Sequence, residues 1–328
     1  MILRGRPIVL SGTLLLVLVS VTVAACGKGG SGQGHARPTA QAGRPSSMTP
    51  VPSPTPTPIA PVEYQAALSA VDAALTPQFS SIFLSGTPAD LAKAFTEAAT
   101  TISTRRSALT QIRPPVNVAS AHIDLLAALW KLASDLQGLA GDARRNALCT
   151  GGAGIPRAAS GSGAQALRQA ATEIGTADPA QSYKVGTFLP AGSPDLNRQP
   201  ANGSLGPGKR GGMGELTING SSTDAVVKLT RDGSLIRNVY VRAGATVTVD
   251  AIPDGTLDAF FTTGTDWDAA GGRFTRDCTF SKFDQSLPYR TNYYRTETQY
   301  TTFTLTLYKS AAGNASTSRV DPGSFPAS

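Results

Sequence analysis

Apolar residues between positions 62 and 182 recur every three or four residues, which is the spacing of one face of an α-helix. The clearest run extends from about Val116 to Leu139, and at about 100° per residue its apolar side chains share one face. The predicted face contains Leu125, Leu126, Leu129, Leu132, Ala133, Leu136 and Leu139, with Ile123 and Trp130 at its margin. Polar residues lie opposite, so we expect an amphipathic helix that packs against a core.

Other helices are expected on both sides of this run. Pro88 suits the first turn of a helix, and Pro114-Pro115 is typical of the end of one. The additional helices are predicted at Val62–Leu75, Pro88 to about Ile112, Arg144–Cys149 and Ala164–Ile174. Residues 62–182 are therefore predicted to form a small up-and-down helical bundle.

From Gly214 onward apolar and polar residues alternate, as in strands with one buried face. Asp232-Gly233 is typical of a tight turn between two strands. This pattern predicts an antiparallel β-sandwich, immunoglobulin-like or transthyretin-like, over residues 214–310. The fold class is thus α+β with two domains, joined by a linker at 183–213 and followed by a tail at 311–328.

The first 61 residues have the pattern of an export signal and a tether. Arg4 and Arg6 precede an apolar run that ends in Val23-Ala24-Ala25-Cys26, which resembles the lipobox of bacterial lipoproteins. The resemblance implies removal of a signal peptide, residues 1–25, and lipidation of Cys26 with acyl chains such as palmitate. We therefore expect a membrane partner through Cys26 and a location on the extracytoplasmic face of the cell membrane. Residues 26–61, rich in Gly and Pro, are expected to be a tether.

The net charge of +7 does not indicate nucleic-acid binding, because the excess of Lys and Arg lies in the signal and the linkers. The predicted helical and β segments are each close to neutral, whereas phosphate binding needs basic residues clustered on a folded surface. The segment Gly203–Gly211 fits nucleotide-loop spacings but neither follows a predicted strand nor begins a predicted helix. We predict no nucleic-acid partner and no cofactor.

Two cysteines, Cys149 and Cys278, remain after Cys26 is assigned to the anchor. In an oxidising compartment they could form one disulfide between the helical and β segments. The alternative is two separately buried thiols.

Three carboxylates in the β segment have part of a calcium-loop spacing. Asp266, Asp268 and Asp277 stand at positions 1, 3 and 12, but Ala270 stands at position 5 and position 12 is usually Glu. The alternative is that these residues shape a turn and that Trp267 packs over one end of the sandwich. The same carboxylates would be the acids of an enzyme if they faced one cleft.

Aromatic and basic residues gather near the end of the β segment. Tyr289, Tyr293, Tyr294 and Arg295, together with Trp267, are of the types enriched at recognition surfaces, so they are candidate ligand contacts. The alternative is a strand pair whose rings cover the sheet. His122 lies on the apolar arc of the third helix and is interpreted as a core histidine, with a ligand role as the alternative.

Short motifs in both halves carry a further resemblance. They include Arg113-Pro114-Pro115 and Ala147-Leu148-Cys149-Thr150-Gly151 in the first half, and Tyr240-Val241-Arg242-Ala243-Gly244 and Ile252-Pro253-Asp254-Gly255-Thr256 in the second. On these residues the helical half resembles uncharacterised actinobacterial lipoproteins, and the other half resembles a small uncharacterised bacterial β-domain. The resemblance supports the fold and the location, and it implies no activity.

These observations favour a lipid-anchored module of the cell envelope that binds a protein, peptide or glycan without catalysis. One alternative is a cell-envelope hydrolase that uses the carboxylates of the β segment. The other is a passive spacer of the cell surface.

Overall fold

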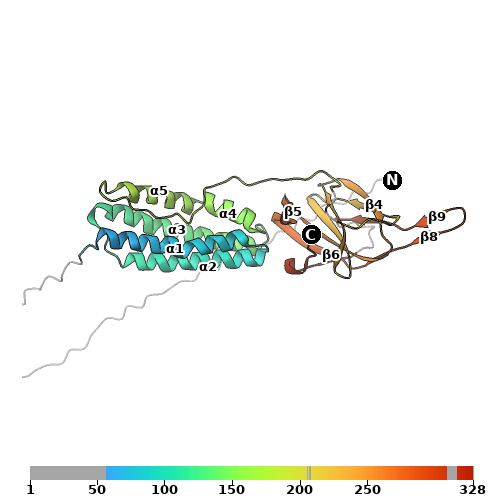
Figure 1. Cartoon of the computed structure of the whole chain (residues 1–328), viewed down its shortest axis with the longest axis horizontal. Coiled ribbons are helices and arrows are strands. Elements are labelled where there is room, and N and C mark those ends of the chain that lie inside the picture. The colour runs from blue at the N-terminus through green and yellow to red at the C-terminus, as the bar shows by residue number, and fades with distance from the viewer. Residues whose placement is uncertain (1–56, 205, 207, 309–315, 328) are drawn as a thin grey trace, which may run out of the picture. The chain divides into compact units, whose positions relative to one another are not determined.

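The computed structural model describes residues 57–327, apart from 205, 207 and 309–315. The predicted signal peptide, Cys26 and most of the tether lie outside these residues. Residues Thr55–Ser328 group as one compact unit. Its helices precede its sheets along the chain, so the fold is mixed α+β, as the hydrophobic pattern predicts (Figure 1).

Five α-helices are present in the described part of the chain. They are α1 (Pro61–Leu84), α2 (Pro88–Thr110), α3 (Ala119–Arg144), α4 (Gly151–Ser160) and α5 (Ser162–Thr176), with a short 3₁₀-helix η1 (Val116–Val118) before α3. The boundaries of α2 follow from its sequence, because Pro88 is its first residue and the Thr87 hydroxyl accepts a hydrogen bond from the Asp90 amide. Helix α1 is longer than predicted and continues through Pro77 to Leu84.

The buried face of α3 is narrower than the predicted one. Leu125, Leu129 and Leu136 are fully buried in the helical core. In contrast, Ile123 and Trp130 are 66% and 62% exposed, so the prediction that they border the core is wrong. Buried leucines and alanines of α3 form its inner face, and α3 packs mainly against α2 and α5.

Helix α4 corrects the prediction of a helix at Arg144–Cys149. Residues 145–150 form the connection after α3, and α4 begins at Gly151, within a glycine-rich stretch that argues against a helix. The helix packs so closely on the end of α1 that a Cβ at Gly151 would collide with the carbonyl oxygens of Ile82 and Phe83. Tertiary packing therefore explains both the glycine and the helix.

The strands form two main sheets and a small third one. Their bounds are β1 Gly214–Asn219, β2 Asp224–Arg231, β3 Ser234–Val241, β4 Thr246–Ile252, β5 Gly255–Asp268, β6 Arg273–Phe283, β7 Leu287–Tyr289, β8 Thr291–Tyr293, β9 Thr298–Tyr300, β10 Thr302–Thr306 and β11 Thr317–Arg319. One sheet has the order β10-β1-β4, and another has the order β11-β6-β5-β2-β3 with β7 paired to β5. Strands β8 and β9 pair with each other.

The strand pattern is confirmed with two exceptions. Strand β11 lies in the segment predicted as a tail and pairs antiparallel with β6. Asp232 and Gly233 both have positive φ in the turn between β2 and β3, as their sequence predicts. However, β1 and β10 are parallel, so the β segment is not antiparallel throughout. Apolar side chains from both main sheets, such as Ile218 and Val227, belong to one buried cluster.

The predicted linker at 183–213 has no helix or strand among its described residues, but it is held along much of its length. Tyr183 and Phe188 are buried in the helical core. Farther on, backbone hydrogen bonds join Gly203 and Ser204 to Tyr240 at 2.9 Å each. This segment is therefore an ordered part of the fold.

The helices and the sheets are joined at the end of α3. Cys149 and Cys278 form a disulfide, with Cα atoms 6.3 Å apart. Backbone hydrogen bonds lie beside it, from the Cys149 amide to Thr275 (2.8 Å) and from the Cys278 amide to Asn146 (3.1 Å). The sequence left this pairing open, and the structure places both cysteines in one bridge.

Candidate binding surface

Strands β8 and β9 form a hairpin that extends away from the two main sheets (Figure 1). Its register pairs Thr291 with Tyr300 and Tyr293 with Thr298. At the tip, the Tyr294 amide donates to the Glu297 carbonyl at 2.9 Å and closes the turn. A two-stranded ribbon is marginally stable by itself, so its geometry depends on how its base is held.

The base of the hairpin is fixed by a carboxylate. Both the amide and the hydroxyl of Thr291 donate to Asp254, at 2.9 and 2.8 Å. Immediately before it, Tyr289 is only 1% exposed, and its ring packs edge-on against Phe303 at 5.1 Å. Because the hairpin starts from these anchors, its direction is set although its tip makes few contacts.

Tyrosines occupy one face and the tip of the hairpin. Directly paired residues of antiparallel strands share a face, so Tyr293 and Tyr300 lie on the same side, whereas Asn292 and Gln299 lie on the other. Tyr293 is 76% exposed, Tyr294 in the turn 56% and Tyr300 44%. The hairpin thus presents an aromatic face and an amide face to solvent.

The structure separates the candidate contact residues into two groups. Tyr293, Tyr294 and Arg295 lie together on the exposed hairpin. Tyr289 is buried, and burial raises the pKa of its hydroxyl. Trp267 is 9% exposed and packs against Tyr240 and Phe274, so neither of these two rings belongs to the exposed surface.

The three aspartates of the calcium-loop spacing do not form one site. Asp266 is buried and accepts hydrogen bonds from the side chain and backbone of Arg198, and Asp268 accepts one from the same guanidinium at 3.2 Å. Asp277 is exposed. Among the described residues, no group of three His, Cys, Asp or Glu side chains lies close enough to hold a metal ion.

Arg198 is the partner that sequence reasoning missed. It lies in the segment predicted as a linker, 68 residues from Asp266, and no periodic pattern marks it. Burial tends to raise the pKa of Asp266, but hydrogen bonds from Arg198 and Thr275 outweigh this effect and lower the pKa to about 2. The carboxylate is therefore held ionised as part of the fold.

His122 is a core residue, 4% exposed. Its Nδ1 lies 3.1 Å from the Tyr64 hydroxyl, and the Tyr64 ring meets Tyr183 edge-on. Burial lowers the pKa of the imidazole, and the nearby backbone of Leu109 opposes this shift only in part. This environment favours a neutral, structural histidine.

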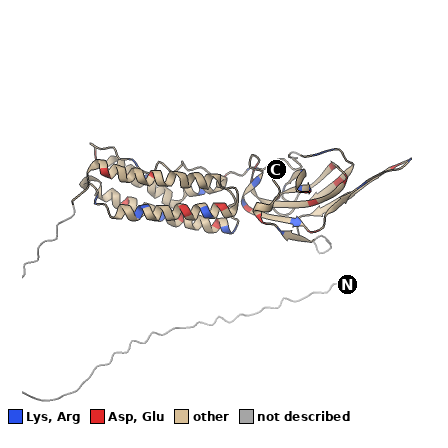
Figure 2. Ribbon diagram, turned by 60° about the horizontal axis from the view of Figure 1, so that its bottom comes forward, with Lys and Arg blue, Asp and Glu red and all other residues tan. Residues whose placement is uncertain are grey.

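Acidic and basic residues are interspersed over the described helices and strands (Figure 2). None of the described helices is both long and apolar enough to cross a bilayer. Comparison with protein-family models, with curated proteins and with solved structures found no match for this chain.

Proposed function

We propose that this chain is a lipid-anchored, extracytoplasmic interaction module that binds a protein of the cell envelope through the β8–β9 hairpin and carries out no catalysis. The observation that carries this proposal is the exposure of Tyr293, Tyr294 and Tyr300 on a hairpin with a fixed base. Apolar rings of this size cost free energy when they face water, and a partner that covers them removes that cost.

The residue types on the hairpin suit recognition of a protein surface. A tyrosine ring brings a large contact area with few rotatable bonds, and its hydroxyl still forms hydrogen bonds. Arg295 stands in the same turn and adds a planar donor group. Tyr and Arg residues are enriched among the contacts that contribute most to binding energy.

The location in this proposal rests on the amino-terminal sequence. A cleaved signal and a lipid on Cys26 would attach the chain to the membrane, and the tether at 26–61 would hold the fold away from the lipid surface. We also infer that the helices form an up-and-down bundle and the two main sheets form a sandwich. The buried apolar cluster to which both main sheets contribute supports the sandwich, and the separate buried cluster of the helices supports the bundle.

The test is affinity capture from detergent-solubilised cell envelope with the full chain as bait. The Tyr293→Ala and Tyr294→Ala double variant removes the aromatic surface, and the Asn292→Ala and Gln299→Ala double variant is the matched control on the opposite face. We expect a specific protein to be captured by the parent and the control and lost, by tenfold or more, with the tyrosine variant.

Three outcomes would contradict the proposal. Equal capture by both double variants would remove the hairpin from recognition. Capture that is abolished by periodate oxidation of the envelope would indicate a glycan ligand instead of a protein. Absence of any specific partner would favour the passive spacer.

A further inference from the structure

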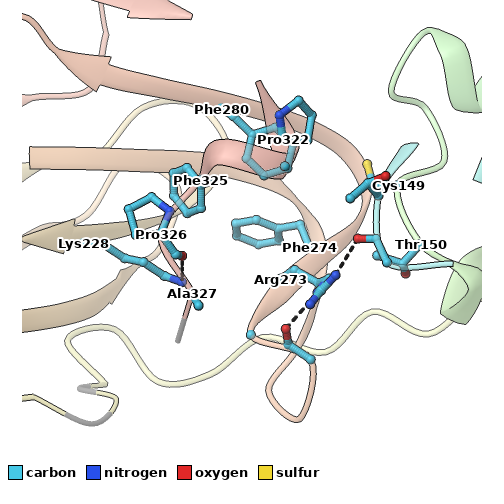
Figure 3. Close-up of a pocket in the computed structure, with 15 residues that line it drawn as sticks. Cys149, Thr150, Lys228, Arg273, Phe274, Phe280, Pro322, Phe325, Pro326 and Ala327 are labelled. Carbon is cyan, nitrogen blue, oxygen red and sulfur yellow. Dashed lines mark hydrogen bonds between the residues drawn. The ribbon is translucent and has the colours of Figure 1, made fainter. Parts of the chain in front are cut away.

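A cavity of about 240 Å³ lies beside the disulfide, between the loop that precedes α4 and the carboxy-terminal segment. Figure 3 shows Thr150 and Cys149 on one side, Phe325 and Pro326 on the other, and Phe274 and Arg273 between them. The volume is below the ~300–1,000 Å³ of typical sites for drug-sized ligands, so the cavity suits a small molecule.

The charged groups that line this cavity are all positive. Lys228 of β2 is 1% exposed, and its ammonium donates to the Pro326 carbonyl at 2.7 Å. Arg273 at the start of β6 donates from Nη1 to the Gly86 carbonyl at 2.5 Å and from Nε to the Gly271 carbonyl at 2.8 Å. Among the described residues that line the cavity, none is Asp or Glu.

Two helix amino termini add to this positive potential. Thr87 and Thr150, the residues that precede α2 and α4, both line the cavity. The first turn of a helix carries a partial positive charge, which favours an anion nearby. Asp90 in the first turn of α2 is hydrogen-bonded to the Thr87 hydroxyl and does not line the cavity.

The Thr150 hydroxyl independently indicates a ligand. Thr150 is 6% exposed, and within the described part of the chain its Oγ1 has no hydrogen-bond partner. It does not cap α4, in contrast to Thr87, which caps α2. A buried hydroxyl without a partner costs free energy, and a ligand with an acceptor atom in the cavity would satisfy it.

The remaining walls are apolar. Phe274, Phe280 and Phe325 line the cavity, and the rings of Phe280 and Phe325 meet at 5.3 Å. The Phe325 ring also lies 5.2 Å from the Lys228 ammonium. Contact with these rings does not stabilise an inorganic anion, whereas it stabilises an organic anion that buries an apolar group against them.

We propose that this cavity binds a small organic anion, a carboxylate on an aromatic or similarly apolar body, with Thr150 as a hydrogen-bond donor and Lys228 and Arg273 as the cationic surroundings. The site is separate from the hairpin, so this inference does not depend on the proposed function. Burial, and to a lesser degree Arg273, lowers the pKa of Lys228 to about 8, and an anion in the cavity would offset that loss of hydration.

The test is isothermal titration calorimetry on the full chain in detergent, with benzoate as the probe. Benzamide, which has the same shape without the charge, and inorganic phosphate, which has charge without an apolar body, are the comparison ligands. We expect benzoate to bind at one site with a Kd below about 1 mM and each comparison ligand to bind at least tenfold more weakly.

Variants then assign the binding to this cavity. Thr150→Val keeps the shape of the side chain and removes the donor, so benzoate binding should weaken at least tenfold, and Lys228→Met should have a larger effect. Lys282→Met is the matched control, because Lys282 also lies over a phenylalanine ring, Phe260 at 5.3 Å, but does not line the cavity.

Far-UV circular dichroism and the Tm establish that each variant is folded. Thr150→Val tests the proposal even where Lys228→Met fails to fold. The proposal is overturned if benzoate does not bind, if benzamide or phosphate binds as tightly as benzoate, or if Thr150→Val binds benzoate with unchanged affinity.

Discussion

The pair of Arg198 and Asp266 should contribute measurably to the stability of the β region. Arg198 donates to the Asp266 carboxylate from Nε and Nη2, each at 2.8 Å, and the Asp266 side chain is 3% exposed. Replacing Arg198 by Met removes both donors and leaves the carboxylate buried. Loss of one partner of a fully buried pair costs roughly 3–5 kcal/mol, and the cost here should be smaller because the Arg198 side chain is 41% exposed.

The lowered pKa of Asp266 gives a second way to calculate the free energy that its partners contribute to stability. Its fall from 3.8 to about 2 corresponds to about 2.5 kcal/mol, since a tenfold change in a protonation constant is worth about 1.36 kcal/mol. The Arg198 amide and the Thr275 hydroxyl also lower this pKa and remain in the variant, so the Arg198 side chain accounts for only part of this free energy. We therefore expect the Arg198→Met variant to lose about 2 kcal/mol of unfolding free energy at pH 7. Because the folded-state pKa is lowered, this stabilisation is complete above pH 4 and is lost as the pH falls towards 2.

Urea denaturation of the full chain in detergent at pH 7 and at pH 2 measures the effect. The double variant Arg198→Met, Asp266→Asn should be more stable at pH 7 than Arg198→Met alone, because it contains no unpaired buried charge. Arg145→Met is the matched control at an exposed pair with Asp142, and it should cost less than about 1 kcal/mol. A loss below 1 kcal/mol for Arg198→Met at pH 7, or a loss equally large at pH 2, would refute this reasoning.

Two further predictions concern the helices. Because burial lowers the pKa of His122, its protonation opposes folding, and the unfolding free energy should fall as the pH drops below 6.5. In the His122→Gln variant the Tm should therefore change less between pH 7 and pH 5 than in the parent. The same change of Tm in both proteins would contradict this role. Gly151→Ala should lower the unfolding free energy by roughly 1–3 kcal/mol through collision with the end of α1. The control is Gly138→Ala in α3, where a Cβ meets nothing within 4 Å, and it should raise the unfolding free energy by about 0.5–1 kcal/mol. Similar changes of the unfolding free energy for both variants in urea denaturation would disprove the packing argument.

The predicted elements that agree with the structure are those whose sequence determines local conformation. Pro88 begins α2, and Asp232-Gly233 forms the turn between β2 and β3. Helix α4 was missed because glycine lowers local helix propensity, whereas the close approach to α1 requires it. The parallel pairing of β1 with β10 was also missed, since alternation of apolar residues is the same in parallel and antiparallel pairs.

The candidate functional sites also divide into features that local sequence indicates and features that depend on tertiary contacts. Composition drew attention to Tyr293 and Tyr294, which the structure exposes, but it does not separate them from Tyr289, which is buried. The aspartate spacing was a poor guide because the partner of Asp266 comes from a distant, irregular segment. The cavity near Thr150 is formed by residues from five separate stretches of sequence, so no local pattern could indicate it.

The bridge between Cys149 and Cys278 bears on how the protein withstands proteolysis. It spans 129 positions of sequence and encloses the whole of residues 183–213, which contain no helix or strand among their described positions. A protease that cuts once within that stretch opens the loop but releases neither half. The nicked molecule would migrate as one species without a reducing agent and as two after reduction, so a single cut in this segment would not separate the hairpin from the helices.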